Sequence, residues 1–317
     1  MQTIYYGAPG TGKSYTIDTT IINRVSDDRV FRVTFYPDFT YSDFIGQLLP
    51  KVIPSTVPGG ASTITYDFQK GVFTNALEKA YENTANDVYL IIEEMSRGDC
   101  AAIFGDIFQL LDRERTGVNV GYSKYFITNE LIAKDIIPLR TNGNKVKLPP
   151  NFHILGTVNT SDQNVYVMDT AFKRRFEWKY VSTDPIAASP AGVIPIVYKN
   201  DAQLSIYDGS ALRSISWVEL YQKLNDFIAD DGYLGLGEDK QLGPFFIEFD
   251  ISASATPDDH KKQVQNKLLH YLWSDVHKAS YKSDVRLFKD DLGTFKKLYE
   301  AFDRNEQIFS TTFLNTL

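Results

Sequence analysis

The sequence predicts an α/β protein, with a mostly parallel sheet between two layers of helices in its first part and a smaller, mainly helical domain after it. Short apolar runs alternate with segments of helical periodicity through roughly the first 180 residues. The run at 88–92 carries no charged side chain, as expected of a strand buried on both faces. Beyond Ser182 the composition shifts, and apolar residues then recur mainly at helical spacing.

The order of these segments gives the layout of the chain. Strands are expected at 3–6, 30–36, 88–92 and 152–158, and helices at 13–24, 73–83 and 101–112. Crossovers between parallel strands place helices on both faces of a sheet, so these segments predict a three-layer domain at 1–181. Three apolar stripes, at 217–228, 264–276 and 285–302, predict a helical lid domain at 182–317.

Two long inserts interrupt the alternation, and such inserts in a compact domain are usually functional. Residues 37–70 lie between a strand and the next helix and are rich in Pro, Gly and Ser at 54–62. Residues 117–150 contain Asn142-Gly143, a strong turn signal, so 136–140 are expected to pair with 145–149 as a hairpin.

Composition excludes several classes of protein. The chain of 317 residues is 43% hydrophobic and 23% charged, which are globular values. No apolar run approaches the roughly 18 residues that span a bilayer, and the N-terminus has no signal core, so we expect a cytoplasmic protein that does not enter the membrane. One cysteine and four scattered histidines argue against disulfide and zinc frameworks. A net charge of −7 argues against a protein coated in nucleic acid.

The turn after the first strand fits the pattern G-x-x-x-x-G-K-[ST]. Its glycines let backbone N–H groups converge on an anion, which the N-terminus of the following helix also favours. Lys13 can reach the terminal phosphates of a nucleotide, and the Ser14 hydroxyl can bind Mg²⁺. The predicted nucleotide contacts are Gly7, Ala8, Pro9, Gly10, Thr11, Gly12, Lys13, Ser14 and Tyr15.

Polar side chains follow two later strands. Ligands lie beyond the carboxyl ends of parallel strands, so Glu93 and Glu94 are expected beside the phosphates. We assign Glu93 to the support of Mg²⁺ and Glu94 to the polarisation of the attacking water, because phosphoryl transfer depends on positioning and charge neutralisation. The amide of Asn159 is a candidate to hold that water or a γ-phosphate oxygen, and a capped turn is the alternative.

A pair of arginines, Arg174 and Arg175, stands further along the chain. The planar guanidinium suits phosphate, and such arginines can act on the site of a neighbouring subunit. The alternative is a basic helix end that balances its own dipole. Arg97 is a further candidate for phosphate sensing or for an interface between subunits.

The segments GAPGTGKS, LIIEEMSRGD, GTVNTSD and AFKRRF, in this order, resemble an AAA+ ATPase module. More closely, they resemble the McrB-type GTPase motor of modification-dependent restriction systems, and the run from Asn159 to Asp162 narrows the resemblance to that group. The segments FYPDFTYSDFIGQLLP and QLGPFFI are similar to the family's insert and lid region. The resemblance covers residues 2–180, and 215–280 more loosely.

The resemblance implies roles for individual residues. Lys13 and Ser14 would be the Walker A residues, Glu93 and Glu94 Walker B, Asn159 and Asp162 part of a signature loop that supports water attack, and Arg174 and Arg175 fingers acting in trans. It also implies rings, usually hexamers, that hydrolyse GTP with Mg²⁺ and drive a partner endonuclease of McrC type. DNA would be reached through the partner or through the central pore.

The sequence departs from the family in three places. Glu93 stands where an Asp is usual, and Ser161 where an Ala is usual. Only six residues precede Gly7, so the family's N-terminal DNA-recognition domain is absent from this sequence, and DNA recognition is expected from another subunit unless the sequence is a fragment or a motor-only protein. No guanine-recognition motif of the Ras type is present, which leaves ATP open as the substrate.

Other functions stay open. One is a MoxR or dynein-related ATPase that remodels a protein partner, and another is a nucleotide-gated scaffold without turnover. The two inserts are candidates to line a pore. The second insert is basic and would suit tracking along nucleic acid, although ordinary solvated charges explain the same residues. Its basic residues are Lys124, Lys134, Arg140, Lys145 and Lys147.

Overall fold

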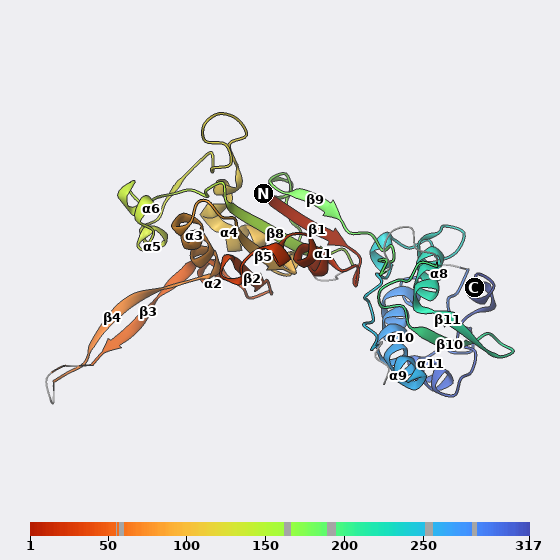
Figure 1. The fold of residues 1–317 in the computed structure, drawn as a ribbon. Coiled ribbons are helices and arrows are strands. Elements are labelled where there is room, and N and C mark those ends of the chain that lie inside the picture. Colours follow the sequence, from red (N-terminus) through yellow and green to blue (C-terminus); the bar gives the residue numbers. More distant parts are fainter. Residues whose placement is uncertain (55, 57–59, 162–165, 189–194, 251–255, 281–283) are drawn as a thin grey trace. The chain divides into compact units, whose positions relative to one another are not determined.

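The computed structural model describes residues 1–54, 56, 60–161, 166–188, 195–250, 256–280 and 284–317 (Figure 1). Contacts within the chain divide it into two compact units. The first unit is Met1–Tyr6 with Ser14–Lys179, and the second is Gly7–Lys13 with Tyr180–Leu317. Each unit has its own apolar core. The domain boundary between 181 and 182 stays a prediction.

The first unit is built on a five-stranded sheet with the strand order β2-β5-β8-β1-β9 (Figure 1). The strands are β1 (Gln2–Gly7), β2 (Val30–Thr34), β5 (Val88–Glu93), β8 (Phe152–Asn159) and β9 (Glu177–Tyr180). Strand β5 runs parallel to both β2 and β8. Every residue of β5 before Glu93 is buried, as its apolar sequence predicted. The predicted α/β class with a parallel sheet is confirmed.

Helices cover this sheet. They are α1 (Lys13–Thr20), α3 (Val72–Glu82), α4 (Cys100–Phe104) and α7 (Thr170–Lys173). Helix α3 packs on β2, β5 and β8 and buries Phe73, Leu77 and Ala80. Two helices are shorter than predicted. Helix α1 ends at Thr20. Helix α4 ends where a 3₁₀ segment (Gly105–Leu111) begins at Gly105, whose positive φ of 46° is a value that glycine adopts without strain.

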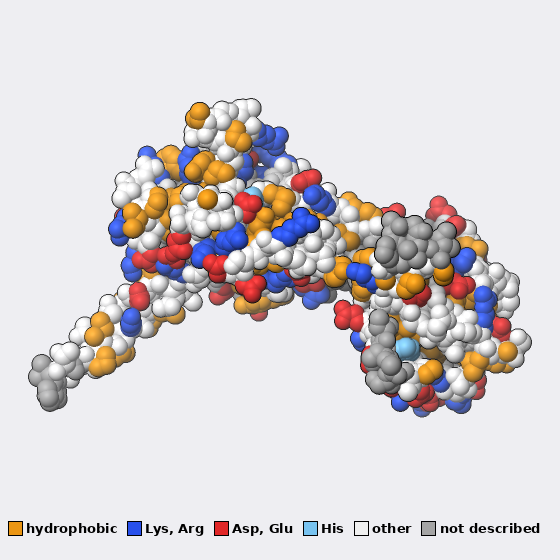
Figure 2. All heavy atoms as spheres, viewed as in Figure 1, with side chains coloured by type: hydrophobic (Ala, Val, Ile, Leu, Met, Phe, Trp, Pro, Cys, Tyr) orange, Lys and Arg blue, Asp and Glu red, His pale blue; other side chains and the backbone are white. Residues whose placement is uncertain are grey.

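The first insert contains secondary structure that the sequence analysis did not identify. After the short helix α2 (Tyr41–Ile45), β3 (Gly46–Ile53) and β4 (Thr63–Lys70) pair as an antiparallel ribbon that projects from the unit (Figure 1). The register pairs Leu48 with Phe68, Pro50 with Tyr66 and Val52 with Ile64. Because side chains alternate between faces, these six residues form one wholly apolar face. Leu48, Val52, Ile64 and Tyr66 are 51–67% exposed on it. Figure 2 shows hydrophobic side chains on the surface of the projecting ribbon.

The hairpin predicted in the second insert is wrong. Most of residues 136–140 lie instead in helix α6 (Ile137–Thr141), where Pro138 in the first turn has the fixed φ that helix starts favour. The pairing in this insert joins β6 (Ile127–Thr128) to β7 (Lys145–Val146), with α5 (Glu130–Ala133) and α6 between them. Asn142-Gly143 does lie in a turn, but the turn ends a helix.

Arg113 anchors the second insert to the sheet. Its guanidinium donates hydrogen bonds of 2.8–3.1 Å to the carbonyl oxygens of Gly121, Leu148, Pro149 and Phe152. Its Nε donates to the Gln2 side chain at 2.7 Å. Burial lowers the pKa of Arg113 to about 10, so the group stays charged at neutral pH. One side chain therefore joins the second insert to the start of β8. Two of its four acceptors, the Leu148 and Pro149 carbonyls, also accept from the backbone N–H groups of Ser123 and Phe152.

The second unit combines a hairpin with helices. The hairpin, β10 (Gln203–Tyr207) and β11 (Leu212–Ser216), was not predicted. The helices are α8 (Trp217–Ala229), α9 (Pro257–Gln263), α10 (Leu269–Tyr271), α11 (Phe295–Asp303) and α12 (Thr311–Leu314). Two π-helical turns, Val264–Leu268 and Leu272–His277, connect and extend α9 and α10. The apolar stripes at 217–228 and 264–276 are buried in the unit's core, as predicted. In the described parts of the chain, no helix combines the length and the apolar character that crossing a bilayer requires.

We predict that Arg113→Met destabilises the fold. Methionine keeps the length and apolar stem but leaves buried carbonyls without donors, which costs about 3 kcal/mol of unfolding free energy. Urea denaturation measures the change. Arg115→Met, at an exposed side chain two residues further on, is the control and should change stability little. Equal stability of the two variants would contradict the anchoring role.

Candidate active site

The phosphate-loop motif joins β1 to α1. Gly10 and Gly12 have φ of 75° and 82°, left-handed values that let successive N–H groups converge. Lys13 is only 8% exposed, and its ammonium donates to the carbonyl oxygens of Gly7 at 3.1 Å and Ala8 at 2.9 Å. The Thr11 hydroxyl also donates to Ala8, at 3.0 Å. A phosphate that binds here would therefore compete with the loop's own carbonyls for the ammonium.

Glu93, at the end of β5, has three donors on its carboxylate. The hydroxyls of Ser14 and Thr157 donate to Oε2 at 2.9 and 2.6 Å, and Arg32 pairs with Oε1 at 2.7 Å. Ser14 and Glu93 thus offer neighbouring oxygen ligands. They fit Mg²⁺, which takes few protein ligands and completes its shell with water and phosphate oxygens. Among the described residues, no group of three or more His, Cys, Asp or Glu could hold a metal ion by itself.

Glu94 turns away from the strand direction. Its φ of 53° and ψ of 44° are left-handed, a conformation that is uncommon for a residue other than glycine. The Glu94 N–H donates to the Thr157 hydroxyl at 3.1 Å. Its carboxylate accepts from the Asn159 amide at 2.8 and 3.0 Å and from Arg97 at 3.3 Å. The ends of β5 and β8 thus bring Glu94 and Asn159 into direct contact.

Two residues of this cluster were missed by the sequence analysis. Arg32 lies on β2 and pairs with both Glu93 and Asp18. Thr157 lies on β8, is buried, and bonds to Glu93 and Glu94 together. Each residue is a polar side chain among apolar neighbours in its strand, and that was the only signal in the sequence for either of them.

The two arginines after α7 have different surroundings. Arg175 has a side chain only 9% exposed, which pairs with Asp112 at 2.7 Å and lies over the Phe108 ring at 4.0 Å. Arg174 is exposed. Of the other predicted site residues, Tyr15 is exposed, and Asp162 lies outside the described residues.

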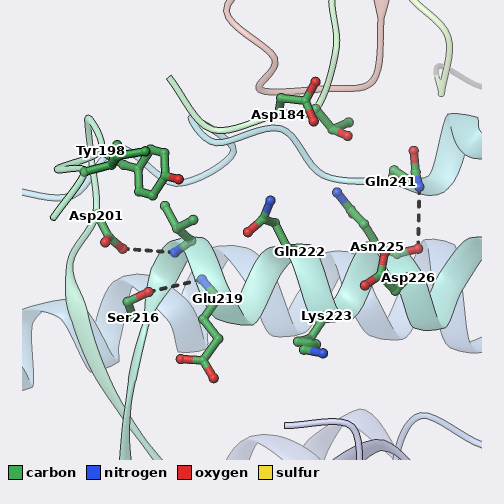
Figure 3. Close-up of a pocket in the computed structure, with 13 residues that line it drawn as sticks. Asp184, Tyr198, Asp201, Ser216, Glu219, Gln222, Lys223, Asn225, Asp226 and Gln241 are labelled. Atoms are coloured by element: carbon green, nitrogen blue, oxygen red, sulfur yellow. Dashed lines mark hydrogen bonds between the residues drawn. The ribbon is translucent and has the colours of Figure 1, made fainter. Parts of the chain in front are cut away.

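A separate hollow of about 600 Å³ lies along α8 in the second unit (Figure 3). Its charged lining is Asp184, Asp201, Glu219, Asp226 and Lys223. None of the predicted site residues lines it. Four carboxylates against one ammonium repel a polyanion, so this hollow is not the site for a nucleotide triphosphate.

Comparison with known proteins identifies the family. The model of the AAA domain (dynein-related subfamily) matches residues 2–176, more than half of the chain. The chain belongs to this AAA family. The AAA protein is 34% identical to the type II restriction enzyme BsuMI component YdiS of Bacillus subtilis (strain 168), over 97% of this chain and 87% of that protein.

A second relative of this AAA protein is the type IV methyl-directed restriction enzyme EcoKMcrB subunit of Escherichia coli (strain K12). It is 24% identical over 178 residues, 55% of this chain and 34% of that protein, so the chain spans about a third of it. A solved structure of a proposed ATPase from Cytophaga hutchinsonii ATCC 33406 aligns with 98% of this chain and 86% of that chain at 14% identity, but its TM-score of 0.33 is too low to support a conclusion. The resemblance to McrB-type AAA+ motors of restriction systems is confirmed.

We predict that Thr157→Val lowers nucleoside triphosphate turnover about tenfold or more. The variant loses the hydroxyl that positions Glu93 and the Glu94 backbone, and small displacements of reacting groups are costly. Phosphate release with ATP and with GTP measures turnover. Thr157→Ser keeps the hydroxyl and should retain most of it. Full activity of the valine variant would contradict the positioning by Thr157.

Proposed function

We propose that this AAA protein is a ring-forming, Mg²⁺-dependent nucleoside triphosphatase, with GTP or ATP as substrate, in the cytoplasm. The proposal rests on one observation, the hydrogen-bonded cluster of Ser14, Glu93, Thr157, Glu94 and Asn159 that follows the phosphate-loop motif. The two relatives are named as restriction enzyme components. Their names support a role in a restriction or defence complex, with an endonuclease of McrC type as partner.

In this proposal, residues 1–181 bind the nucleotide and 182–317 form the lid. The loop amides and Lys13 bind the phosphates, and Tyr15 flanks them. Ser14 and Glu93 would hold Mg²⁺, which supplies charge neutralisation when bound. Glu94 polarises the attacking water. Asn159, already bonded to both oxygens of Glu94, sets the direction of that carboxylate, and Asp162 supports the same loop.

We further propose that an arginine finger acts between neighbours in a hexameric ring. The exposure of Arg174 supports its role in trans. The ion pair of Arg175 with Asp112 supports a role within its own subunit instead. Stabilisation of the terminal phosphate by a neighbour makes turnover depend on assembly.

The first insert favours an alternative function, the remodelling of a protein partner. The apolar face of the β3–β4 ribbon suits contact with a protein, as in an AAA+ ATPase that remodels a protein partner. The second insert keeps exposed cations, including Lys124 and Lys145, that suit DNA reached through a pore or a partner. Phosphate release with GTP and ATP in parallel, with and without DNA, separates these roles. Nucleotide binding without any phosphate release would instead indicate a scaffold.

We predict that Glu94→Gln binds nucleotide normally but turns over about 100-fold or more slowly, because the amide cannot take a proton from water. Calorimetry with a non-hydrolysable analogue measures binding, and phosphate release measures turnover. Glu306→Gln, at an exposed carboxylate of the second unit, is the control. Retained turnover in Glu94→Gln would contradict the role of this carboxylate.

We predict that Arg174→Ala and Lys13→Ala are each inactive but recover activity when mixed. In a ring with one type of interface, random mixing gives a productive pair at about one interface in four, so about a quarter of wild-type turnover should return. Phosphate release from the mixture measures the recovery. No recovery, with rings still formed on gel filtration, would contradict action in trans.

A further inference from the structure

The second unit holds a contact that the proposed catalytic roles do not use. We propose that residues 242–246 form a strap that fixes the peptide orientation of the phosphate loop, with Gly243 and Asn225 as its positioning residues. The inference rests on the proposed function in taking the loop as the triphosphate site. The loop residues Gly7–Lys13 and the strap lie in the same compact unit.

The strap bonds to the loop through its backbone. The Gly243 N–H donates to the Pro9 carbonyl at 2.9 Å, and the Phe245 N–H donates to the Gly10 carbonyl at 2.8 Å. Pro244, between these two donors, has no N–H to satisfy. Of the four N–H groups in the strap, those of Gly243 and Phe245 therefore bond to the loop, while those of Leu242 and Phe246 bond to Asn225 and to the Gly243 carbonyl.

Because each peptide is planar, these hydrogen bonds also fix the direction of the loop N–H groups. In a trans peptide the N–H points opposite to the C=O. The Pro9 carbonyl shares its peptide with the Gly10 N–H, and the Gly10 carbonyl shares its peptide with the Thr11 N–H. Holding both carbonyls toward the strap therefore directs both N–H groups to the opposite side of the loop, as a phosphate cradle needs.

The approach between strap and loop leaves no room for a side chain. A Cβ on Gly243 would lie 2.3 Å from the carbonyl carbon of Gly10 and 2.3 Å from the nitrogen of Thr11. A Cβ on Gly10 would lie 2.3 Å from the nitrogen of Phe246. All of these are backbone atoms, which cannot rotate away. Glycine at 243 is therefore required by the contact itself.

Buried side chains hold the strap in place. Asn225, 4% exposed on α8, donates to the Leu242 carbonyl at 2.8 Å and accepts from the Leu242 N–H at 2.7 Å (Figure 3 labels Asn225). Trp217 Nε1, on the same helix, donates to the Pro244 carbonyl at 2.8 Å. The strap is thus fixed on both sides of Gly243, and the loop contacts a rigid support.

Loop N–H groups that already point toward the phosphate should raise the affinity for nucleotide and leave the rate of the chemical step unchanged. Amides that already point toward the phosphate need no reordering on binding, which is the general advantage of preorganisation. The groups assigned to water attack, Glu94 and Asn159, stand at the ends of β5 and β8 and are not part of the loop that the strap supports. Loss of the strap should therefore raise Kd and KM, and leave kcat at saturation nearly unchanged.

The test is Gly243→Ala in the full chain, compared with Gly293→Ala, whose added Cβ would meet no atom within 4 Å. Calorimetry with non-hydrolysable Mg-GTP and Mg-ATP analogues gives Kd, and phosphate release gives KM and kcat. We expect Kd and KM to rise about tenfold or more for Gly243→Ala alone, with kcat within about twofold. Equal Kd values for the two variants would overturn the proposal.

A second pair separates positioning from loss of stability. Asn225→Ala and Gln265→Ala each remove a buried amide, and Gln265 bonds to Tyr299 instead of the strap. Both should lower the melting temperature, but only Asn225→Ala should raise Kd. Equal increases in Kd for the two variants would mean that the loss of stability alone weakens nucleotide binding, and would overturn the strap's role. If the wild-type chain bound neither analogue, the proposed function itself would fail, and the strap's role with it.

Discussion

The parallel pairing of β5 with β2 and β8 is the constraint on which the candidate site depends. Parallel strands bring their carboxyl ends to one edge of the sheet. There β2 contributes Arg32, β5 contributes Glu93, and β8 contributes Thr157 and Asn159. The buried apolar residues of β5 hold this edge fixed, so the polar groups at the strand ends meet without long flexible connections. The packing of the apolar core therefore fixes the positions of the polar side chains in the candidate site.

Two adjacent carboxylates at this edge have different surroundings. Glu93 is held by Arg32 and two hydroxyls, while Glu94 is held by the Asn159 amide and Arg97. The left-handed backbone at Glu94 makes this separation possible, at a cost of about 1 kcal/mol or more for a non-glycine residue. The Thr157 hydroxyl bonds to both residues and so fixes their relative position. This arrangement suits one carboxylate near a metal and one facing water.

Two segments of the chain, the β3–β4 ribbon and residues 242–246, lie outside the parallel sheet and the helices that cover it. The β3–β4 ribbon carries an apolar face of which only Phe68 is buried in the core of the first unit, and isolated two-stranded ribbons are only marginally stable. Residues 242–246 lack regular secondary structure, but they are held in place by hydrogen bonds from the buried Asn225 amide and Trp217 indole. The ribbon therefore exposes an apolar surface, whereas residues 242–246 form a rigid support.

The sequence by itself determined four of the five strands of the parallel sheet (β1, β2, β5 and β8), the phosphate-loop motif, and the placement of Glu93, Glu94 and Asn159 at strand ends. These features are local, because alternation, apolar runs and motif spacing are set by neighbours along the chain. Only the tertiary structure decided that Arg32 and Thr157 join the site, that the Arg175 side chain pairs with Asp112 while Arg174 is exposed, and that Gly243 contacts Gly10. Those contacts join segments far apart in sequence. Their register depends on how whole elements pack, which no local pattern encodes.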